Sequence, residues 1–114
     1  MNLQSVIDSL ELKVLTSPLN FGQVKPTSGY SSDLLSCVMA GAKKDSLWIT
    51  LQCHDNIVAV AALLEMAAVI ITEDAQPDPS TITRANGKNI ILLSTPLSNY
   101  TVIGKLWEMG LRSE

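Results

Sequence analysis

The chain is poor in the side chains that most often carry chemistry. Its 114 residues include one histidine and two cysteines, and aromatic residues make up 4%. Basic residues are also scarce, with 8 Lys and Arg against 11 Asp and Glu and a formal net charge of −3. This acidic balance argues against a nucleic-acid binder, because such proteins usually carry a basic patch. The composition predicts a protein that is not an enzyme and has no catalytic residue.

Standard nucleotide and metal motifs are missing as well. The 6 glycines form neither a Gly-x-x-x-x-Gly-Lys-Ser/Thr loop nor a Gly-x-Gly-x-x-Gly loop, which excludes the two common phosphate-binding loops. Cys37 and Cys53 lie too far apart for a Cys-x-x-Cys knuckle. The acidic residues do not follow the spacing of an EF-hand loop. We therefore expect no metal and no cofactor.

Secretory and membrane-spanning patterns are also missing. The start, MNLQSVID, has no basic region followed by a long apolar run. The most apolar stretch, Ile57 to Ile71, is shorter than the roughly 18–20 residues that cross a bilayer and contains Glu65. We expect a cytoplasmic protein without membrane contact, in which Cys37 and Cys53 are reduced and buried.

Apolar residues, at 46% of the chain, are abundant and follow an alternation of strands and helices. Continuous apolar runs at 46–51, 68–71 and 89–93 are typical of strands that are buried on both faces of a sheet. A short strand is expected at 12–15, a weak strand or loop at 21–26, and a flexible polar loop at 28–32. Helices are predicted by periodicity and capping residues at 1–10, 34–41, 57–66, 79–85 and 98–109.

These elements predict an α/β fold. Because two β-α-β crossovers follow each other, the sheet should be mostly parallel, with four to five strands and helices on both faces. The length suits one compact domain covering residues 1–114. Asp33 is the expected N-cap of the helix at 34–41, and Ser98 or Asn99 that of the last helix.

The predicted sheet also indicates where a ligand would bind. In open parallel sheets, ligands bind at the carboxyl ends of the strands, near a reversal in strand order. Polar segments at 28–33, 52–56, 72–78 and 94–98 should follow strand ends. The simpler interpretation of their polar residues is capping and turn formation. If the segments converge, the ligand-binding residues would include Gly29, Asp33, His54, Asp55, Thr95 and Ser98.

His54 is the side chain whose ordinary titration lies near neutral pH. It lies beside Asp55 at an expected helix N-terminus, where it would bind an anion, sense pH, or only hydrogen-bond its loop. A catalytic pair with Cys53 is disfavoured, because neighbouring side chains on an extended segment point in opposite directions.

The two tryptophans are too dispersed in the sequence for base stacking. Trp48 falls within a predicted strand and is expected in the core. Trp107 lies on the last predicted helix, Met109 at its end and Leu111 just after it; core packing is one interpretation of Trp107, and the other is that the three form an apolar patch for a partner chain.

Three segments carry a family resemblance: GYSSDLLS at 29–36, WITLQ at 48–52 and STPLS at 94–98. With the pattern between them, residues 12–111 resemble the DRTGG-domain family, in particular small stand-alone members related to the amino-terminal domain of HPr kinase/phosphorylase. That kinase carries its phosphate-binding loop in a separate domain, so the resemblance implies a parallel α/β domain without kinase activity. The matched loop or pocket positions are Gly29, Asp33, Ser36, Thr95 and Ser98.

The motif Asp-Arg-Thr-Gly-Gly that names the family is absent, and QCHDN at 52–56 stands where we expect the corresponding turn. No role of the motif's arginine is therefore carried over. Elsewhere, the DRTGG domain accompanies nucleotide-sensing CBS domains and phosphotransacetylase as a regulatory or dimer-forming part. Small stand-alone members tend to be encoded near iron-only hydrogenase-like and redox-signalling proteins.

We predict a non-catalytic regulatory module that acts through homodimerisation, partner docking or small-ligand sensing, in hydrogenase-linked or redox regulation. The alternative is a protein that binds a small molecule or an anion, such as a nucleotide or phosphate, in the strand-end loops. An enzyme with a Cys–His or acidic site ranks last.

Overall fold

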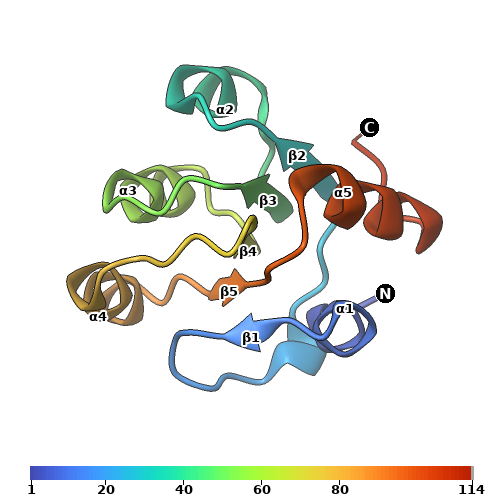
Figure 1. Cartoon of the computed structure of the whole chain (residues 1–114), viewed down its shortest axis with the longest axis horizontal. Coiled ribbons are helices and arrows are strands. Elements are labelled where there is room, and N and C mark those ends of the chain that lie inside the picture. The colour runs from blue at the N-terminus through green and yellow to red at the C-terminus, as the bar shows by residue number, and fades with distance from the viewer. Residues whose placement is uncertain (114) are drawn as a thin grey trace.

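A five-stranded sheet forms the centre of the computed structural model, which describes residues 1–113. The strand order is β1-β5-β4-β3-β2, and all neighbours are parallel except β1, which pairs antiparallel with β5 (Figure 1). The α/β architecture with a mostly parallel sheet is confirmed. The strands are β1 (Lys13–Val14), β2 (Ser28–Ser31), β3 (Ser46–Thr50), β4 (Ala68–Ile71) and β5 (Leu92–Ser94).

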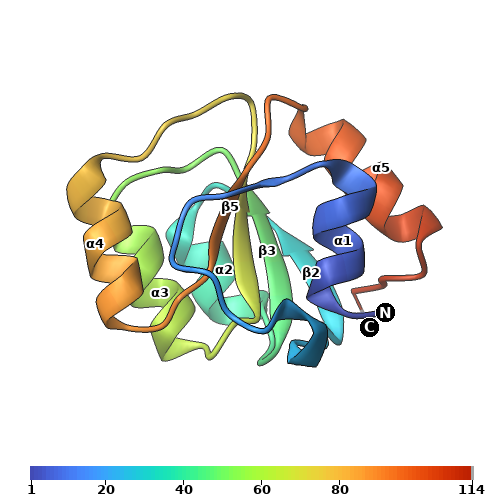
Figure 2. The ribbon, with the colours of Figure 1, turned by 90° about the horizontal axis from the view of Figure 1, so that it is seen from below.

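Helices cover both faces of the sheet, as predicted (Figure 2). One face is covered by the helices that connect consecutive parallel strands, namely α2 (Leu35–Gly41), α3 (Asn56–Leu63) and α4 (Pro79–Gly87). The other face is covered by α1 (Leu3–Leu10), the 3₁₀ turn η1 (Phe21–Gln23) and α5 (Asn99–Glu108). Within residues 1–113, the helices are too short or too polar to cross a membrane.

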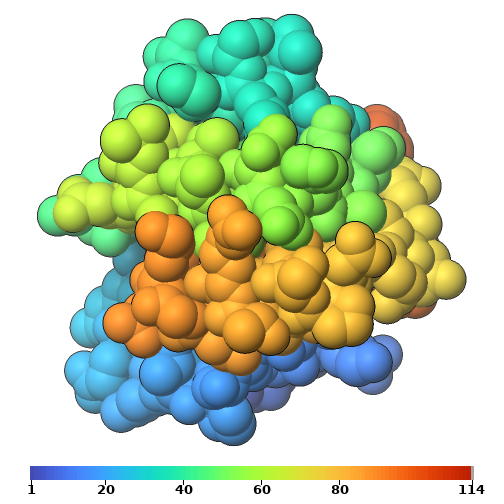
Figure 3. Space-filling model, turned by 90° about the vertical axis from the view of Figure 1, so that its left-hand side faces the viewer, coloured from blue at the N-terminus to red at the C-terminus, as the bar shows by residue number. Residues whose placement is uncertain are grey.

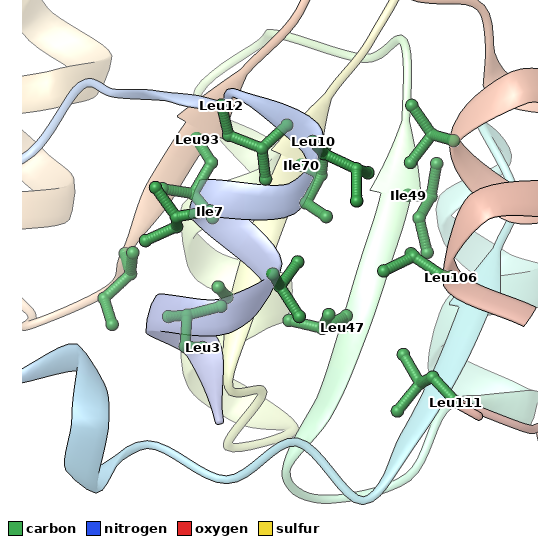
Figure 4. Packing of buried hydrophobic residues seen from close by; sticks show 14 of the residues in the cluster. Leu3, Ile7, Leu10, Leu12, Leu47, Ile49, Ile70, Leu93, Leu106 and Leu111 are labelled. Atoms are coloured by element: carbon green, nitrogen blue, oxygen red, sulfur yellow. The ribbon is translucent and has the colours of Figure 1, made fainter. Parts of the chain in front are cut away.

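Alternation along the strands sends side chains into two separate hydrophobic clusters. Leu47 and Ile49 of β3 face α1 and α5, whereas Trp48, between them, faces α2 to α4. Figure 4 shows the first cluster, with Leu3 and Leu106 pointing from their helices toward the sheet. Because β3 is buried along its whole length, its three central residues are apolar without alternation, and its terminal Ser46 and Thr50 are buried as well. Each fully buried large apolar side chain contributes about 1.5–3 kcal/mol.

Trp48 lies in the core, as its position in a predicted strand suggested. Its side chain is fully buried, and its indole N–H donates to the Ser32 carbonyl oxygen at 2.9 Å. Helices α2, α3 and α4 cover the second hydrophobic cluster, to which Trp48 belongs, and lie side by side in chain order (Figure 3). The segment after β1 extends the row next to α4, where the Ser17 N–H donates to Asn86 Oδ1 at 2.7 Å.

Two boundaries differ from the sequence prediction. The flexible loop predicted at 28–32 is wrong, because Ser28 to Ser31 form edge strand β2. Pairing with β3 satisfies the backbone groups on one side of the strand, and the Ser31 hydroxyl donates to the Ile49 carbonyl oxygen at 3.0 Å, so the strand forms without an apolar sequence. The strand expected at 89–93 starts only at Leu92, because Asn89 adopts a left-handed conformation with φ 57°.

The expected burial of both cysteines is also wrong. Cys37 is exposed, Cys53 is half-buried, and both are free thiols. The reason is that α2 is a short edge helix in which Val38 is the buried residue. Its other positions, Cys37 included, are exposed or half-buried.

Candidate functional site

The carboxyl ends of the parallel strands meet along one edge of the sheet, at the top of Figure 2. The chain leaves β4 toward α4 on one face and leaves β5 toward α5 on the opposite face. The reversal at which open α/β sheets usually bind ligands therefore falls between the loops after β4 and β5.

The chain itself fills this reversal point. The Glu73 N–H donates to the Leu97 carbonyl oxygen at 2.9 Å, and the Asp74 N–H donates to that of Thr95 at 3.2 Å. Both Glu73 and Asp74 adopt left-handed conformations with φ 59°, which turns their N–H groups toward the neighbouring loop. These hydrogen bonds close the crevice that a ligand would enter.

At the N-terminus of α5 beside this loop, side chains accept hydrogen bonds from two backbone N–H groups. Ser98 is the N-cap, as predicted, and its hydroxyl oxygen accepts the Thr101 N–H at 3.2 Å. The Glu73 carboxylate accepts the Asn99 N–H at 2.9 Å and thus supplies the anion that a helix N-terminus attracts. Thr95 is buried, and its hydroxyl oxygen accepts a backbone N–H of its own loop. Thr95 and Ser98 therefore serve the turn and the cap.

The prediction that Asp33 caps α2 is wrong, since the N-cap is Leu34 and no side chain caps it. Asp33 Oδ1 instead accepts the Thr50 hydroxyl at 2.7 Å and the Leu51 N–H at 2.8 Å. The Gln52 side-chain amide donates a hydrogen bond to the Asp33 carbonyl oxygen at 3.1 Å. Because the Thr50 residue is fully buried, its hydroxyl needs an acceptor, and Asp33 joins the loop after β2 to the end of β3.

His54 and Asp55 stabilise different parts of the fold although they are neighbours in sequence. The exposed His54 ring accepts the Asn56 N–H through Nδ1 at 3.2 Å, so it caps the start of α3. With Nδ1 as acceptor, the neutral ring carries its proton on Nε2. The Asp55 carboxylate accepts the Thr81 hydroxyl and lies 3.7 Å from the Arg84 guanidinium, which links α3 to α4.

A groove of about 360 Å³ lies beside the ends of β3 and β4 and is the candidate ligand site. Of the ligand residues predicted from the sequence, it contains His54. Cys53, which the sequence suggested only as a disfavoured catalytic partner of His54, also lines it. Asp78 is the charged residue among those that line it, and neither Lys nor Arg belongs to that set. The lining residues are Leu51, Gln52, Cys53, His54, Gln76 and Asp78.

Gly29 lies at a different hollow, an apolar cavity of about 180 Å³ between β2, α5 and the C-terminal segment. Its N–H donates to the Arg112 carbonyl oxygen at 3.1 Å. The Arg112 guanidinium covers the Trp107 ring at 4.4 Å from the ring centroid. Leu111 is buried and Met109 half-buried in the first cluster, so Trp107 is the member of the predicted patch that remains exposed.

The predicted ligand residues therefore do not line one crevice. Thr95 and Ser98 bond within their own segment, Asp33 bonds to the end of β3, Gly29 faces the apolar cavity, and Ser36 is exposed on α2. Within residues 1–113, His, Cys, Asp and Glu side chains do not gather in groups that could hold a metal ion.

Comparisons with known proteins identify the fold. The model of the DRTGG domain family matches residues 34–109. The structure also resembles the CBS and DRTGG domains of the regulatory region of Clostridium perfringens pyrophosphatase, solved in complex with its activator diadenosine tetraphosphate, with a TM-score of 0.72 at 18% identity. The match covers 90% of this chain and 44% of that one, so the chain spans less than half of that regulatory region. A comparison with curated proteins finds no match.

Proposed function

The chain belongs to the DRTGG domain family, and from this membership we propose that it is a non-catalytic regulatory module of the cytoplasm. The observation that carries the proposal is the fold that this chain shares with a DRTGG-containing regulatory region over 90% of its length. The module acts by forming a homodimer or by docking on a partner protein.

The use of the polar residues supports a structural rather than a catalytic role for the loops. Asp33 and Asp55 accept hydrogen bonds from threonine hydroxyls, and His54 Nδ1 caps a helix. A general base needs a free acceptor directed at a substrate. These groups instead fix the ends of β3, α3 and α4.

Sedimentation velocity from micromolar to millimolar concentration tests the homodimer. We expect a concentration-dependent shift from monomer to dimer. A monomer at every concentration would contradict self-association.

If the module instead docks on a partner protein, we propose that it acts in hydrogenase-linked or redox regulation, as the family resemblance implies. Co-purification of tagged chain with iron-only hydrogenase-like or redox-signalling proteins encoded beside it tests this proposal. We expect a stoichiometric complex with one of them. Failure of every pair to co-purify would contradict the assignment.

A second candidate function is small-ligand binding in the groove. His54 favours it because it lines the groove and because, within residues 1–113, its Nδ1 and not its Nε2 takes part in a hydrogen bond. The groove also holds the carboxylate of Asp78, which opposes an anion. If a nucleotide or phosphate binds here, Asp78→Asn should strengthen binding several-fold and His54→Ala should weaken it.

Thermal shift with diadenosine tetraphosphate, ATP and inorganic phosphate measures these effects, with Ser36→Ala as the exposed control outside the groove. A flat melting profile at millimolar ligand, or equal shifts in all variants, would exclude an anion site in the groove.

A further inference from the structure

The outer side of α5 presents large apolar side chains that the chain leaves wholly or partly exposed. Tyr100 is 88% exposed, Ile103 38% and Trp107 52%. Their spacing places them on one side of the helix, whereas Val102 and Leu106 face the core from the other side. Exposed apolar side chains gathered on one side of a helix indicate an interaction site. We call Tyr100, Ile103, Gly104 and Trp107 the α5 stripe.

Gly104 lies in the middle of the stripe, and the fold of the single chain does not explain it. A glycine in a helix interior costs about 0.5–1 kcal/mol relative to alanine. A Cβ added at Gly104 would meet no atom within 4 Å, so the chain has room for a side chain there. By contrast, a Cβ at Gly41 of α2 would lie 2.5 Å from the Tyr30 hydroxyl. Gly41 serves packing within the chain, whereas Gly104 leaves space open to the outside.

From these observations we infer that a second copy of this chain packs its α5 antiparallel against the first, so that Tyr100 of each copy rests on Gly104 of the other. This inference rests on the proposed homodimerisation and specifies its face. A two-fold contact requires a self-complementary surface. The stripe meets that requirement, because a protruding ring and a vacant position lie four residues apart, about one helical turn, on the same side of α5.

Charges beside the stripe favour the antiparallel arrangement. The Glu73 carboxylate is fixed at the N-terminal end of α5 by its bond from the Asn99 N–H, and Lys105 is exposed in the second half of the helix. Antiparallel pairing brings Glu73 of one copy toward Lys105 of the other, with the exposed Glu108 one turn further along, whereas parallel pairing would bring the two Glu73 carboxylates together. The helix dipoles also favour the antiparallel pair.

The size of the surface predicts weak association. A ten-residue helix is only about 15 Å long, and stable interfaces bury roughly 800 Å² per partner. The adjoining apolar cavity of about 180 Å³ is smaller than ordinary small-ligand pockets, which measure roughly 300–1,000 Å³. Both sizes favour a reversible protein contact over a small-molecule site at this face.

The Gly104→Leu variant distinguishes this specific packing from non-specific hydrophobic association. Added apolar surface would strengthen a non-specific contact, whereas a side chain at Gly104 would displace the partner's Tyr100. In sedimentation velocity we expect at least a tenfold rise in the dimer dissociation constant. The matched control is Gly87→Leu on α4, which also has no atom within 4 Å of an added Cβ and should dimerise like the wild type.

Lys105→Glu tests the charge arrangement. It should weaken the dimer several-fold at low salt and less at high salt, because salt screens the new repulsion from Glu73. Lys88→Glu makes the same charge change on an exposed residue next to α4 and should have little effect.

Fluorescence quenching by acrylamide supplies a second readout. Trp48 is fully buried, so quenching reports mainly on Trp107, which should become less accessible as the dimer forms. Two results would overturn the inference: a Gly104→Leu dimer at least as tight as that of the wild type, or a wild-type dimer that leaves Trp107 accessible. In both cases the homodimer of the proposed function would stand. A wild-type monomer at millimolar concentration would overturn both.

Discussion

Single polar residues at the strand ends act as acceptors for donors that folding buries or leaves unpaired. Asp33 serves the Thr50 hydroxyl and the Leu51 N–H, and His54 serves the start of α3. Thr50 is fully buried, and an unpaired buried donor costs about 1–3 kcal/mol, which is enough to select an acceptor such as Asp33 without any ligand. Polar character in a loop is therefore weak evidence for a binding site when the fold leaves such donors nearby.

Asp33→Ala should lower the free energy of unfolding by about 1–3 kcal/mol, because it leaves two donors without their acceptor. Asp33→Asn, which keeps one side-chain oxygen, should lose less. Urea denaturation measures the change, and the exposed control Ser36→Ala should stay within about 0.5 kcal/mol of wild type. Equal stability of Asp33→Ala and wild type would show that Asp33 does not hold the two loops together.

At the scale of elements, the loop that follows β4 and the start of α5 are joined by hydrogen bonds into one unit. Glu73 joins them twice, through its N–H to the Leu97 carbonyl oxygen and through its carboxylate to the Asn99 N–H. Ser98 completes the cap of α5. Since the α5 stripe belongs to this helix, the cap also fixes the surface that we infer for dimerisation.

Ser98→Ala should destabilise α5 by about 1 kcal/mol, because the Thr101 N–H loses its acceptor. Hydrogen exchange measures the effect, which should appear as faster exchange in the first turn of α5. Ser80→Ala on the exposed side of α4 should leave exchange in α5 unchanged. Unchanged protection of the Thr101 amide in Ser98→Ala would refute the cap.

At the scale of the whole molecule, the C-terminal segment closes one edge of the fold. Leu111 is buried in the first cluster, and the Arg112 carbonyl oxygen accepts the Gly29 N–H of edge strand β2. The first residues of the chain and this segment thus contribute to the same hydrophobic cluster, which includes Leu3.

Leu111→Ala should lower the free energy of unfolding by about 2–5 kcal/mol, the range for emptying a buried leucine site. Thermal unfolding measures the loss as a lower Tm. Leu63→Ala is the control, because Leu63 is 68% exposed and its truncation should leave Tm nearly unchanged. Similar Tm values for both variants would contradict a structural role of the C-terminal segment.

The sequence predicted most accurately the strands that are buried on both faces of the sheet. The runs that form β3 and β4 are buried on both faces, so continuous apolar sequence identified them. Edge strand β2 was missed because its Ser28 to Ser31 segment forms through backbone pairing with β3, and local hydrophobicity does not encode such pairing. In the candidate groove, the sequence singled out His54 as a ligand residue but did not single out Gln76 and Asp78.

The sequence by itself determined the α/β class, the succession of elements and the segments that follow the strands, because periodicity and caps are local properties. Only the tertiary structure decided which polar groups pair with each other, that Glu73 fills the crevice beside β5, and that Gly104 lies at the centre of an exposed apolar stripe. These features depend on contacts and exposure between segments distant in the chain. The physical reason is that hydrogen-bond partners and burial are set when elements pack, whereas periodicity is present before packing.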